Sequence, residues 1–317
     1  MRFLQQAKNG LNEWWMYPIV IVITFVGYFL GQVPLLFAVM RSLDSDINLG
    51  TDDLQSFFSN PDFSTIGISN NIGLLLLLVV FIFALVTFYF IFTVVHKRAF
   101  TSLISPLQKL NWKKVLFSFL LWFLLAGVAE GVLYYMTPET YALTFNPRKF
   151  AVLFIIAILI LPIQTSFEEI LFRGYIMQGI GSVARQPWIP LVITSLLFGL
   201  VHSSNPEVAS YGLLPMQFYY VSAGLFLGLI TILDDSLDLA LGVHAATNIF
   251  GALILSYEGG AMQTDSLFKT STIDPIVMSI AFIATAIIFI LICYKRYNWP
   301  SLQSLFQDVQ EADQPQV

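Results

Sequence analysis

Long runs of apolar residues alternate with short polar segments along most of the chain. A bilayer core of about 30 Å needs about 20 apolar residues in a helix, and eight runs of roughly this kind can be counted. They cover residues 17–40, 73–95, 113–136, 150–167, 188–204, 217–233, 239–256 and 275–294. The fourth run is expected to continue as helix through Arg173. The pattern therefore predicts an all-α, polytopic membrane bundle of about eight transmembrane helices.

Composition agrees with this interpretation. The 317 residues are 57% hydrophobic and 11% charged, with a mean hydropathy of +0.76. A soluble globule needs more polar surface than this. The net charge is −5 and no basic patch with interleaved aromatic residues occurs, so nucleic acid is not expected as a partner. The lone cysteine, Cys293, falls in the last apolar run and allows no intramolecular disulfide.

The distribution of Lys and Arg predicts the orientation. With both termini in the cytoplasm, eleven of these residues fall in inner segments and four in outer ones. This is the bias that the positive-inside rule describes. The longest outer loop, 41–72, is acidic rather than basic. We expect an integral protein of a bacterial cell membrane, whose first span is retained because no small-residue cleavage site follows it.

Six polar residues stand inside or directly beside these apolar runs. An ionisable group at bilayer depth costs about 3 to 15 kcal/mol, so such groups are usually paired or functional. They form three constellations, each containing residues four positions apart that share one helix face. These are Glu168-Glu169-x-x-x-Arg173, Phe198-x-x-x-His202 and His244-x-x-x-Asn248.

The first constellation suggests a general base. Glu169 and Arg173 are one turn apart and can form a salt bridge. Adjacent helical residues point about 100° apart, so Glu168 can face a cavity and take a proton from water. The alternative is that both glutamates pair with Arg173, or that the segment is a solvated helix outside the membrane.

The two histidines have functional and structural interpretations. His202 could hold the attacking water opposite Glu168, with Phe198 forming an apolar wall of the site. Alternatively, His202 is a buried structural residue. His244 and Asn248 could donate hydrogen bonds to the oxyanion of a tetrahedral intermediate. Alternatively they bond between helices, because the small residues around them favour close helix packing.

Together the segments FEEILFRGY, FGLVH and HAATN resemble the signature motifs of the CAAX prenyl protease type II and bacteriocin-processing family, also called CPBP or Abi. The resemblance covers about residues 150–256. It implies an intramembrane endopeptidase in which Glu168 and His202 activate water, His244 and Asn248 stabilise the oxyanion, and Glu169 and Arg173 support the site. It divides one membrane domain into N-terminal helices (1–145), a catalytic core (146–256) and a last helix with a short cytoplasmic tail (257–317).

The resemblance also implies a substrate, which is a membrane-associated or lipidated protein or peptide. Prenyl proteases of this group remove the last three residues of a prenylated C-terminal sequence, and bacterial relatives are linked to bacteriocin immunity and peptide maturation. A non-catalytic immunity or scaffold protein that binds a peptide is the alternative. A transporter is a third hypothesis, although the sequence shows no internal repeat of the kind that many transporters have. Natural substrate and oligomeric state cannot be read from the sequence.

Zinc is the cofactor to consider, since Glu168, His202 and His244 could supply ligands. No His-Glu-x-x-His motif occurs and Arg173 would repel a divalent cation, so a metal-free mechanism is favoured. Glu130, in the third run, is left without a role.

Glu168 and His202 can share a site only if they lie at the same depth in the membrane. Counted from the starts of their runs, Glu168 lies about 27 Å from the outer side and His202 about 21 Å from the inner side. A fourth helix longer than the bilayer could slide or tilt to bring them level.

Overall fold

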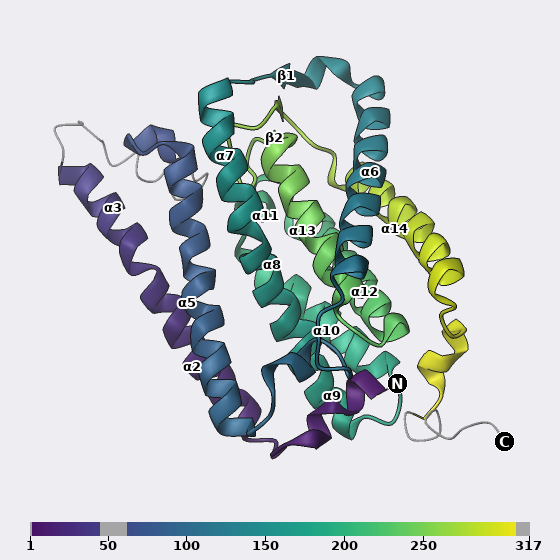
Figure 1. The fold of residues 1–317 in the computed structure, drawn as a ribbon. Helices are drawn as coiled ribbons and strands as arrows, with labels where there is room; N and C mark the ends of the chain where they lie inside the picture. The colour runs from purple at the N-terminus through teal and green to yellow at the C-terminus, as the bar shows by residue number, and fades with distance from the viewer. Residues whose placement is uncertain (1, 45–61, 309–317) are drawn as a thin grey trace.

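The computed structural model describes residues 2–44 and 62–308. The acidic stretch of the outer loop at 45–61 and the tail after Asp308, with the predictions made for them, lie outside the described residues. The long helices are α2 (Met16–Gly31), α3 (Val33–Asp44), α5 (Asn70–His96), α6 (Trp112–Met136), α7 (Pro147–Leu159), α8 (Leu161–Glu169), α9 (Met177–Val183), α10 (Trp188–Val201), α12 (Leu213–Asp234), α13 (Asp238–Leu253) and α14 (Pro275–Tyr297). The prediction of an all-α membrane bundle is confirmed (Figure 1).

Short elements complete the described chain. They are the helices α1 (Arg2–Gln5) and α11 (Pro206–Tyr211), a π-helical turn (Ile170–Ile176), 3₁₀ turns at Gln6–Asn9, Phe63–Ile66, Phe100–Leu103, Pro138–Thr140, His202–Ser204 and Leu302–Phe306, and the strands β1 (Tyr141–Leu143), β2 (Leu255–Tyr257) and β3 (Phe268–Thr270). The strands form one small sheet in the order β1-β3-β2, with β1 antiparallel and β2 parallel to β3. The apolar runs did not predict this sheet.

Each of the eight predicted spans corresponds to a helix. In the described chain, six continuous helices are long and apolar enough to cross a membrane: Met16–Ser42, Asn70–His96, Trp112–Met136, Pro147–Val183, Leu213–Asp234 and Pro275–Tyr297. The other two, α10 and α13, have 14 and 16 residues. These shorter helices carry the histidines of the second and third constellations or end beside them.

Helix starts follow from local sequence. The Asn146 side chain accepts hydrogen bonds from the N–H groups of Arg148 and Lys149 at the start of α7, with Pro147 in the first turn. Asp274 caps α14 in the same way, before Pro275. A side-chain acceptor at the cap and a proline at the first position satisfy the N–H groups that a helix start leaves free.

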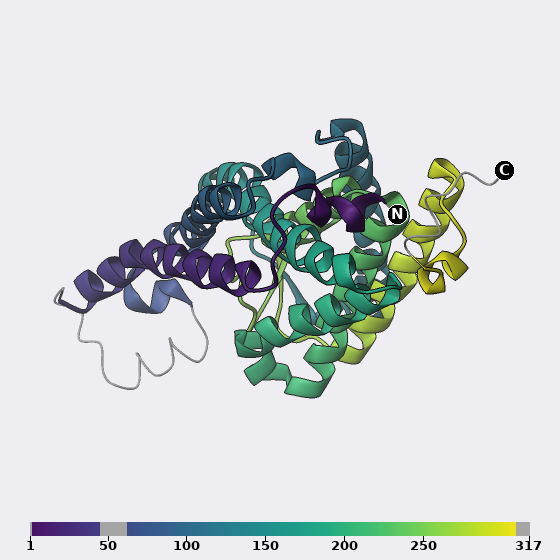
Figure 2. The same ribbon diagram turned by 90° about the horizontal axis from the view of Figure 1, so that it is seen from below.

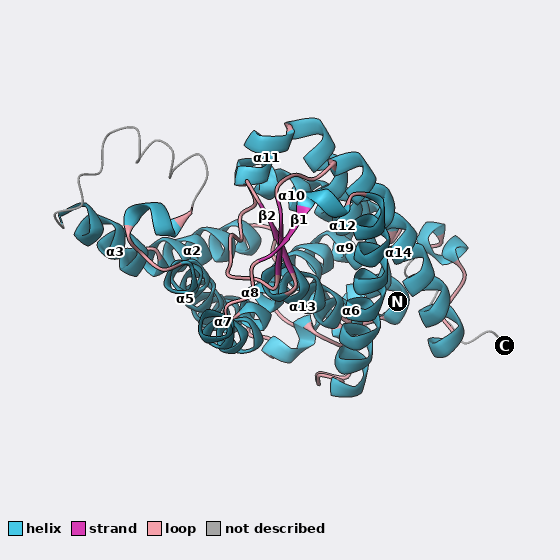
Figure 3. Cartoon of the chain, turned by 90° about the horizontal axis from the view of Figure 1, so that it is seen from above, coloured by secondary structure: helices cyan, strands magenta, loops and turns pink. Residues whose placement is uncertain are grey.

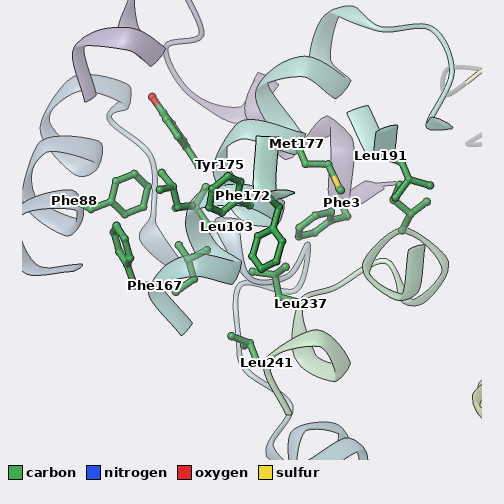
Figure 4. Packing of buried hydrophobic residues seen from close by; sticks show 14 of the residues in the cluster. Phe3, Phe88, Leu103, Phe167, Phe172, Tyr175, Met177, Leu191, Leu237 and Leu241 are labelled. Atoms are coloured by element: carbon green, nitrogen blue, oxygen red, sulfur yellow. The ribbon is translucent and has the colours of Figure 1, made fainter. Parts of the chain in front are cut away.

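The end of the bundle that holds α1 is closed by polar and aromatic contacts. The Phe3 N–H donates to Asp235 Oδ1 at 2.9 Å, and Lys114 Nζ donates to Asp234 Oδ1 at 2.8 Å. Phe3 and Leu4 are fully buried in the largest hydrophobic cluster, which includes Met177 and Leu191 (Figure 4). The start of α1, the start of α6 and the end of α12 therefore meet at one end, which we call the terminal end. We call the end that carries the sheet the sheet end.

The helices α2 and α3 extend to one side of the bundle (Figure 2). α2 packs along α5 through glycines, since a Cβ at Gly27 would lie 2.2 Å from Thr87 Oγ1. On the other side α13 packs against α6, α8 and α12 (Figure 3). The three sequence segments 1–145, 146–256 and 257–317 are thus packed together, and the boundaries between them stay a prediction.

Candidate active site

The helix from Pro147 to Val183 changes its geometry twice. Pro162, in the first turn of α8, lacks the N–H that would continue the hydrogen-bond ladder of α7, and a break occurs at Ile160. Glu168 and Glu169 are the last two residues of α8 and directly precede the π turn. Such turns often occur at functional sites. The expected continuation of this helix through Arg173 is present and reaches Val183.

Glu169 and Arg173 form a fully buried ion pair. Arg173 Nη1 donates to Glu169 Oε1 at 2.6 Å, and both side chains have 0% exposure. Arg173 Nη2 also donates to the Gly224 carbonyl at 3.3 Å, and its guanidinium carbon lies 4.4 Å from the Phe198 ring centroid. A buried charge needs a partner of this kind. The pair therefore anchors the start of the π turn to α10 and α12.

Glu168 faces a different set of groups from Glu169. Gln164 Nε2 donates to Glu168 Oε1 at 2.6 Å, and Asn248 Nδ2 donates to Gln164 Oε1 at 3.0 Å. A carboxylate only accepts hydrogen bonds, so the Gln164 amide must turn its NH₂ to Glu168 and its oxygen to Asn248. Glu168 Oε2 has no hydrogen-bond partner among the described residues. One oxygen of Glu168 is thus held in place and the other is free.

His244 lies between the two carboxylates. Its Nδ1 is 2.7 Å from Glu169 Oε1, and its Nε2 is 3.7 Å from Glu168 Oε2. Since Glu169 accepts, Nδ1 carries a hydrogen. Nε2 can then donate a hydrogen bond only if the imidazole is protonated on both nitrogens.

His202 lies at the end of α10, where the helix tightens into a 3₁₀ turn. Its Nδ1 is 2.7 Å from the Phe198 carbonyl oxygen, so this nitrogen donates, and in the neutral ring Nε2 is then an acceptor. The ring is packed between Phe198 and Tyr220, with both centroids 4.4 Å away. The aromatic contacts fix the ring plane, and the backbone bond fixes its tautomer.

Two adjacent chambers, which share lining residues, bring the candidate residues together. The large chamber, of about 550 Å³, runs between α2, α5, α8 and the end of α10 and has mainly apolar walls. The small chamber, of about 160 Å³, is lined by Glu168, His202, His244 and Asn248. The chambers share Gln164, Glu168, His202, Asn205, Ala261 and Met262. All four residues proposed from the sequence to be catalytic therefore face one small space.

The depths of Glu168 and His202 agree in the structure. Glu168 lies 15 residues before the end of α9 at Val183, and His202 lies 14 residues after the start of α10 at Trp188. At 1.5 Å per residue these separations are about 22 and 21 Å. The helix that carries Glu168 has 37 residues, about 55 Å, and is therefore longer than the bilayer core.

The comparisons with known proteins bear on the same segment. Residues 147–250 match the family model described as Rce1-like, type II CAAX prenyl endopeptidase Rce1-like. The resemblance to this family is confirmed. The curated protein described as uncharacterized protein YyaK, from Bacillus subtilis (strain 168), is 28% identical over 283 residues, which are 89% of this chain and 91% of that protein. No solved structure matches the chain.

The Rce1-like segment contains every residue singled out from the three motifs, and it also contains residues that the motifs did not reveal. Gln164 connects Glu168 to Asn248. Its position four residues before Glu168 was a signal that could have been used. Asn205, Glu207 and Tyr220 form a second polar group beside His202, in which Asn205 Nδ2 donates to Glu207 Oε1 at 3.1 Å and the Tyr220 hydroxyl also donates to it. Nothing in their spacing marks these three as a group.

The metal-ligand hypothesis can be compared with the geometry of the Rce1-like segment. In the described parts of the chain, no three His, Cys, Asp or Glu residues converge as metal ligands do. His244 Nδ1 is occupied by Glu169, and the Arg173 charge lies directly behind that pair. The side chains as placed do not form a zinc site, and the dependence on metal stays a prediction.

Glu130 lies outside the Rce1-like segment and away from both chambers. It accepts a hydrogen bond of 2.5 Å from the Tyr141 hydroxyl on β1. Burial, followed by this bond, raises the pKa of Tyr141, so the phenol keeps its proton and remains a donor. Glu130 therefore fastens α6 to the small sheet.

Proposed function

We propose that the chain is an intramembrane endopeptidase that hydrolyses a peptide bond of a membrane-associated or lipidated substrate. The match to the Rce1-like family supports a CAAX-protease-like intramembrane endopeptidase in general terms. One observation carries the more specific proposal. Glu168 has one fixed and one unpartnered carboxylate oxygen, and it lines a chamber together with His202, His244 and Asn248.

The attacking water is held by two acceptors. Glu168 Oε2 and His202 Nε2 can each accept one of its hydrogens, which leaves an oxygen lone pair for the substrate carbonyl. Glu168 takes a proton as the C–O bond forms. General-base catalysis of this kind typically accelerates a reaction by about 100 to 10,000 fold.

The oxyanion that forms is stabilised by donors of the third motif. Asn248 has a second N–H beyond the one bound to Gln164. A doubly protonated His244 imidazole would also donate to the oxyanion from Nε2, since Nδ1 is already held by Glu169. The C–N bond then breaks, and Glu168 returns its proton to the leaving amine.

The large chamber suits the apolar part of such a substrate. Its walls come from α2 and α5, including Phe25, Leu78 and Phe81. It extends from Glu168 to Leu35 and Leu74, in the half of the bundle toward the sheet end. A lipid chain or apolar peptide segment placed there would bring the adjoining peptide bond to Glu168.

The distribution of positive charge supports an orientation with both termini in the cytoplasm, and we propose a bacterial cell membrane as the location. The lipid bilayer and a peptide substrate are then the partners of the chain.

Cleavage assays test the proposal. Detergent-purified protein is incubated with prenylated and unprenylated peptide libraries, with and without a chelator, and Glu168→Gln is compared with wild type. We expect Glu168→Gln to lose at least about 100-fold in rate, because an amide cannot accept the proton. Glu13→Gln, an exposed change outside both chambers, is the matched control and should retain activity.

The outcomes separate the candidate functions. Activity lost in Glu168→Gln and unaffected by chelator supports the metal-free mechanism. Activity lost with chelator reassigns Glu168, His202 and His244 as metal ligands. Equal inactivity of wild type and Glu168→Gln on all peptides contradicts the proposal and favours an immunity or scaffold protein.

A further inference from the structure

One arginine outside the candidate active site is buried without an anionic partner. Arg98 follows the end of α5 and is only 8% exposed. Its Nε donates to Ser102 Oγ at 2.7 Å, and its Nη2 donates to Gln178 Oε1 at 2.6 Å. Both acceptors are uncharged, and no Asp or Glu in the described chain forms an ion pair with Arg98. Arg173, which is also buried, is by contrast paired with Glu169.

The lack of an anion is significant because Arg98 remains a cation. Burial lowers the pKa of Arg98 to about 10, which still leaves the guanidinium protonated at pH 7. A buried guanidinium is rarely found without an anion, since the loss of its hydration is otherwise not offset. The Phe92 ring, whose centroid lies 5.1 Å from the guanidinium carbon, offsets only part of this cost. An anion bound to Arg98 would therefore stabilise the folded protein.

One nitrogen of Arg98 is available to such an anion. Nη1 has no hydrogen-bond partner among the described residues, and it is not one of the fully buried atoms that lack a partner. It is therefore the nitrogen through which the guanidinium reaches the surface. Lys97, the preceding residue, is exposed and forms no ion pair within residues 2–44 and 62–308. A second cationic side chain thus begins one residue away.

Arg98 lies at the level where lipid headgroups are expected. α5 ends at His96, two residues before Arg98. The N-terminal segment is bound there, since the Leu11 N–H donates to the His96 carbonyl oxygen at 2.9 Å. The same segment carries Trp14 and Trp15, which are 80% and 45% exposed. Exposed tryptophans at the end of a membrane span are typical of the membrane–water interface, which is also where lipid phosphates lie.

We propose that Arg98, together with Lys97, binds a phosphate group at the terminal end of the bundle. The headgroup of an anionic phospholipid and a soluble phosphate present the same oxygens, and either can occupy the site. A phosphate supplies the negative charge that the guanidinium lacks and accepts charge-assisted hydrogen bonds from it. Neither residue lines the two chambers, so this binding does not depend on the proposed hydrolysis.

Short-chain ligands test the site without a bilayer. The full chain in an uncharged detergent is titrated with dihexanoyl phosphatidylglycerol, with inorganic phosphate, and with dihexanoylglycerol, which has the same two chains and no phosphate. The rise of the thermal unfolding midpoint with ligand concentration gives each apparent Kd. We expect phosphatidylglycerol, inorganic phosphate or both to bind at least about tenfold more tightly than dihexanoylglycerol.

The three ligands also identify the source of the phosphate. Tighter binding of phosphatidylglycerol than of inorganic phosphate assigns the site to a lipid headgroup, and the reverse order assigns it to a soluble phosphate. If dihexanoylglycerol binds as tightly as both phosphate-bearing ligands, or if none of the three binds, the proposal is wrong.

Charge-removing variants locate the binding. Arg98→Gln should weaken phosphate binding by about tenfold or more, and Lys97→Gln should weaken it by a smaller factor. Arg148→Gln is the matched control and should leave binding unchanged, because Arg148 is exposed at the start of α7. Unchanged affinity in Arg98→Gln would contradict the assignment. If Arg98→Gln does not fold, Lys97→Gln decides, since it alters an exposed side chain: weaker binding supports the site and unchanged binding contradicts it.

Discussion

Hydrogen-bond direction is the property that organises the site at the scale of single residues. Because Glu168 can only accept, the chain from Asn248 through Gln164 to Glu168 has one donor order. Glu169 likewise requires a hydrogen on His244 Nδ1. Gln164 and His244 are therefore each oriented by a carboxylate that can only accept, and Glu168 keeps Oε2 without a hydrogen-bond partner among the described residues.

Gln164 should act as a positioning residue. Replacing it with leucine removes the donor to Glu168 Oε1 and the acceptor for Asn248 together. We expect kcat to fall by about 10 to 100 fold, in line with the usual cost of unpaired buried polar groups, while KM changes little. Steady-state kinetics with a cleavable peptide would measure the two parameters separately.

The control for this variant is Ser166→Ala, on the same helix but lining neither chamber. A rise in KM with unchanged kcat in Gln164→Leu would mean that Gln164 only shapes the substrate cavity.

At the scale of elements, close helix packing places α13 and its two polar residues. A Cβ on Gly242 would lie 2.0 Å from Ser118 Oγ and 2.3 Å from the Val115 carbonyl of α6. Similarly, a Cβ on Gly224 of α12 would lie 2.9 Å from Ser195 Cα of α10. The small residues noted in the sequence therefore serve contacts within the bundle.

Gly242→Ala should destabilise the bundle by about 1 to 3 kcal/mol, because the contacted atoms include backbone and cannot move aside. Gly131→Ala is the matched control, since nothing lies within 4 Å of its Cβ position. It should be neutral or stabilising by up to about 1 kcal/mol, the difference in helix propensity. Unfolding in mixed micelles compares the two variants, and equal stability would contradict the packing argument.

The elements that could be predicted from sequence are those with a strong local signal. Apolar runs located the eight helices, and the i, i+4 spacing located the Glu169–Arg173 pair. Glu207 could not be found this way, because its partners Tyr220 and Ala261 come from distant segments, whereas Gln164 stands four residues before Glu168 and could have been found by the same spacing. The strands have three residues each, and their pairing is set by tertiary contacts between 141–143, 255–257 and 268–270. Nor does sequence show how far the long fourth helix is displaced along its axis relative to α10, which decides whether Glu168 and His202 are level.

At the scale of the whole molecule, the orientation in the membrane can be tested by chemical labelling of intact bacterial cells. In a Cys293→Ser background, Glu139→Cys lies between α6 and β1 at the sheet end, and Lys109→Cys lies just before α6 at the terminal end. With the termini in the cytoplasm, a membrane-impermeant thiol reagent should label Glu139→Cys only. Labelling of Lys109→Cys alone would show that the protein has the opposite orientation, with its termini outside the cell.

The different lining of the two chambers also affects how water and substrate reach the proposed site of hydrolysis. Every hydrolysis consumes one water molecule, and apolar cavities tend to stay dry whereas polar ones retain ordered water. The large chamber has mainly apolar walls, while Glu207 and Tyr220 line only the small one. In the proposed reaction, the large chamber accordingly delivers the substrate and the small one stores the water that replaces each molecule consumed.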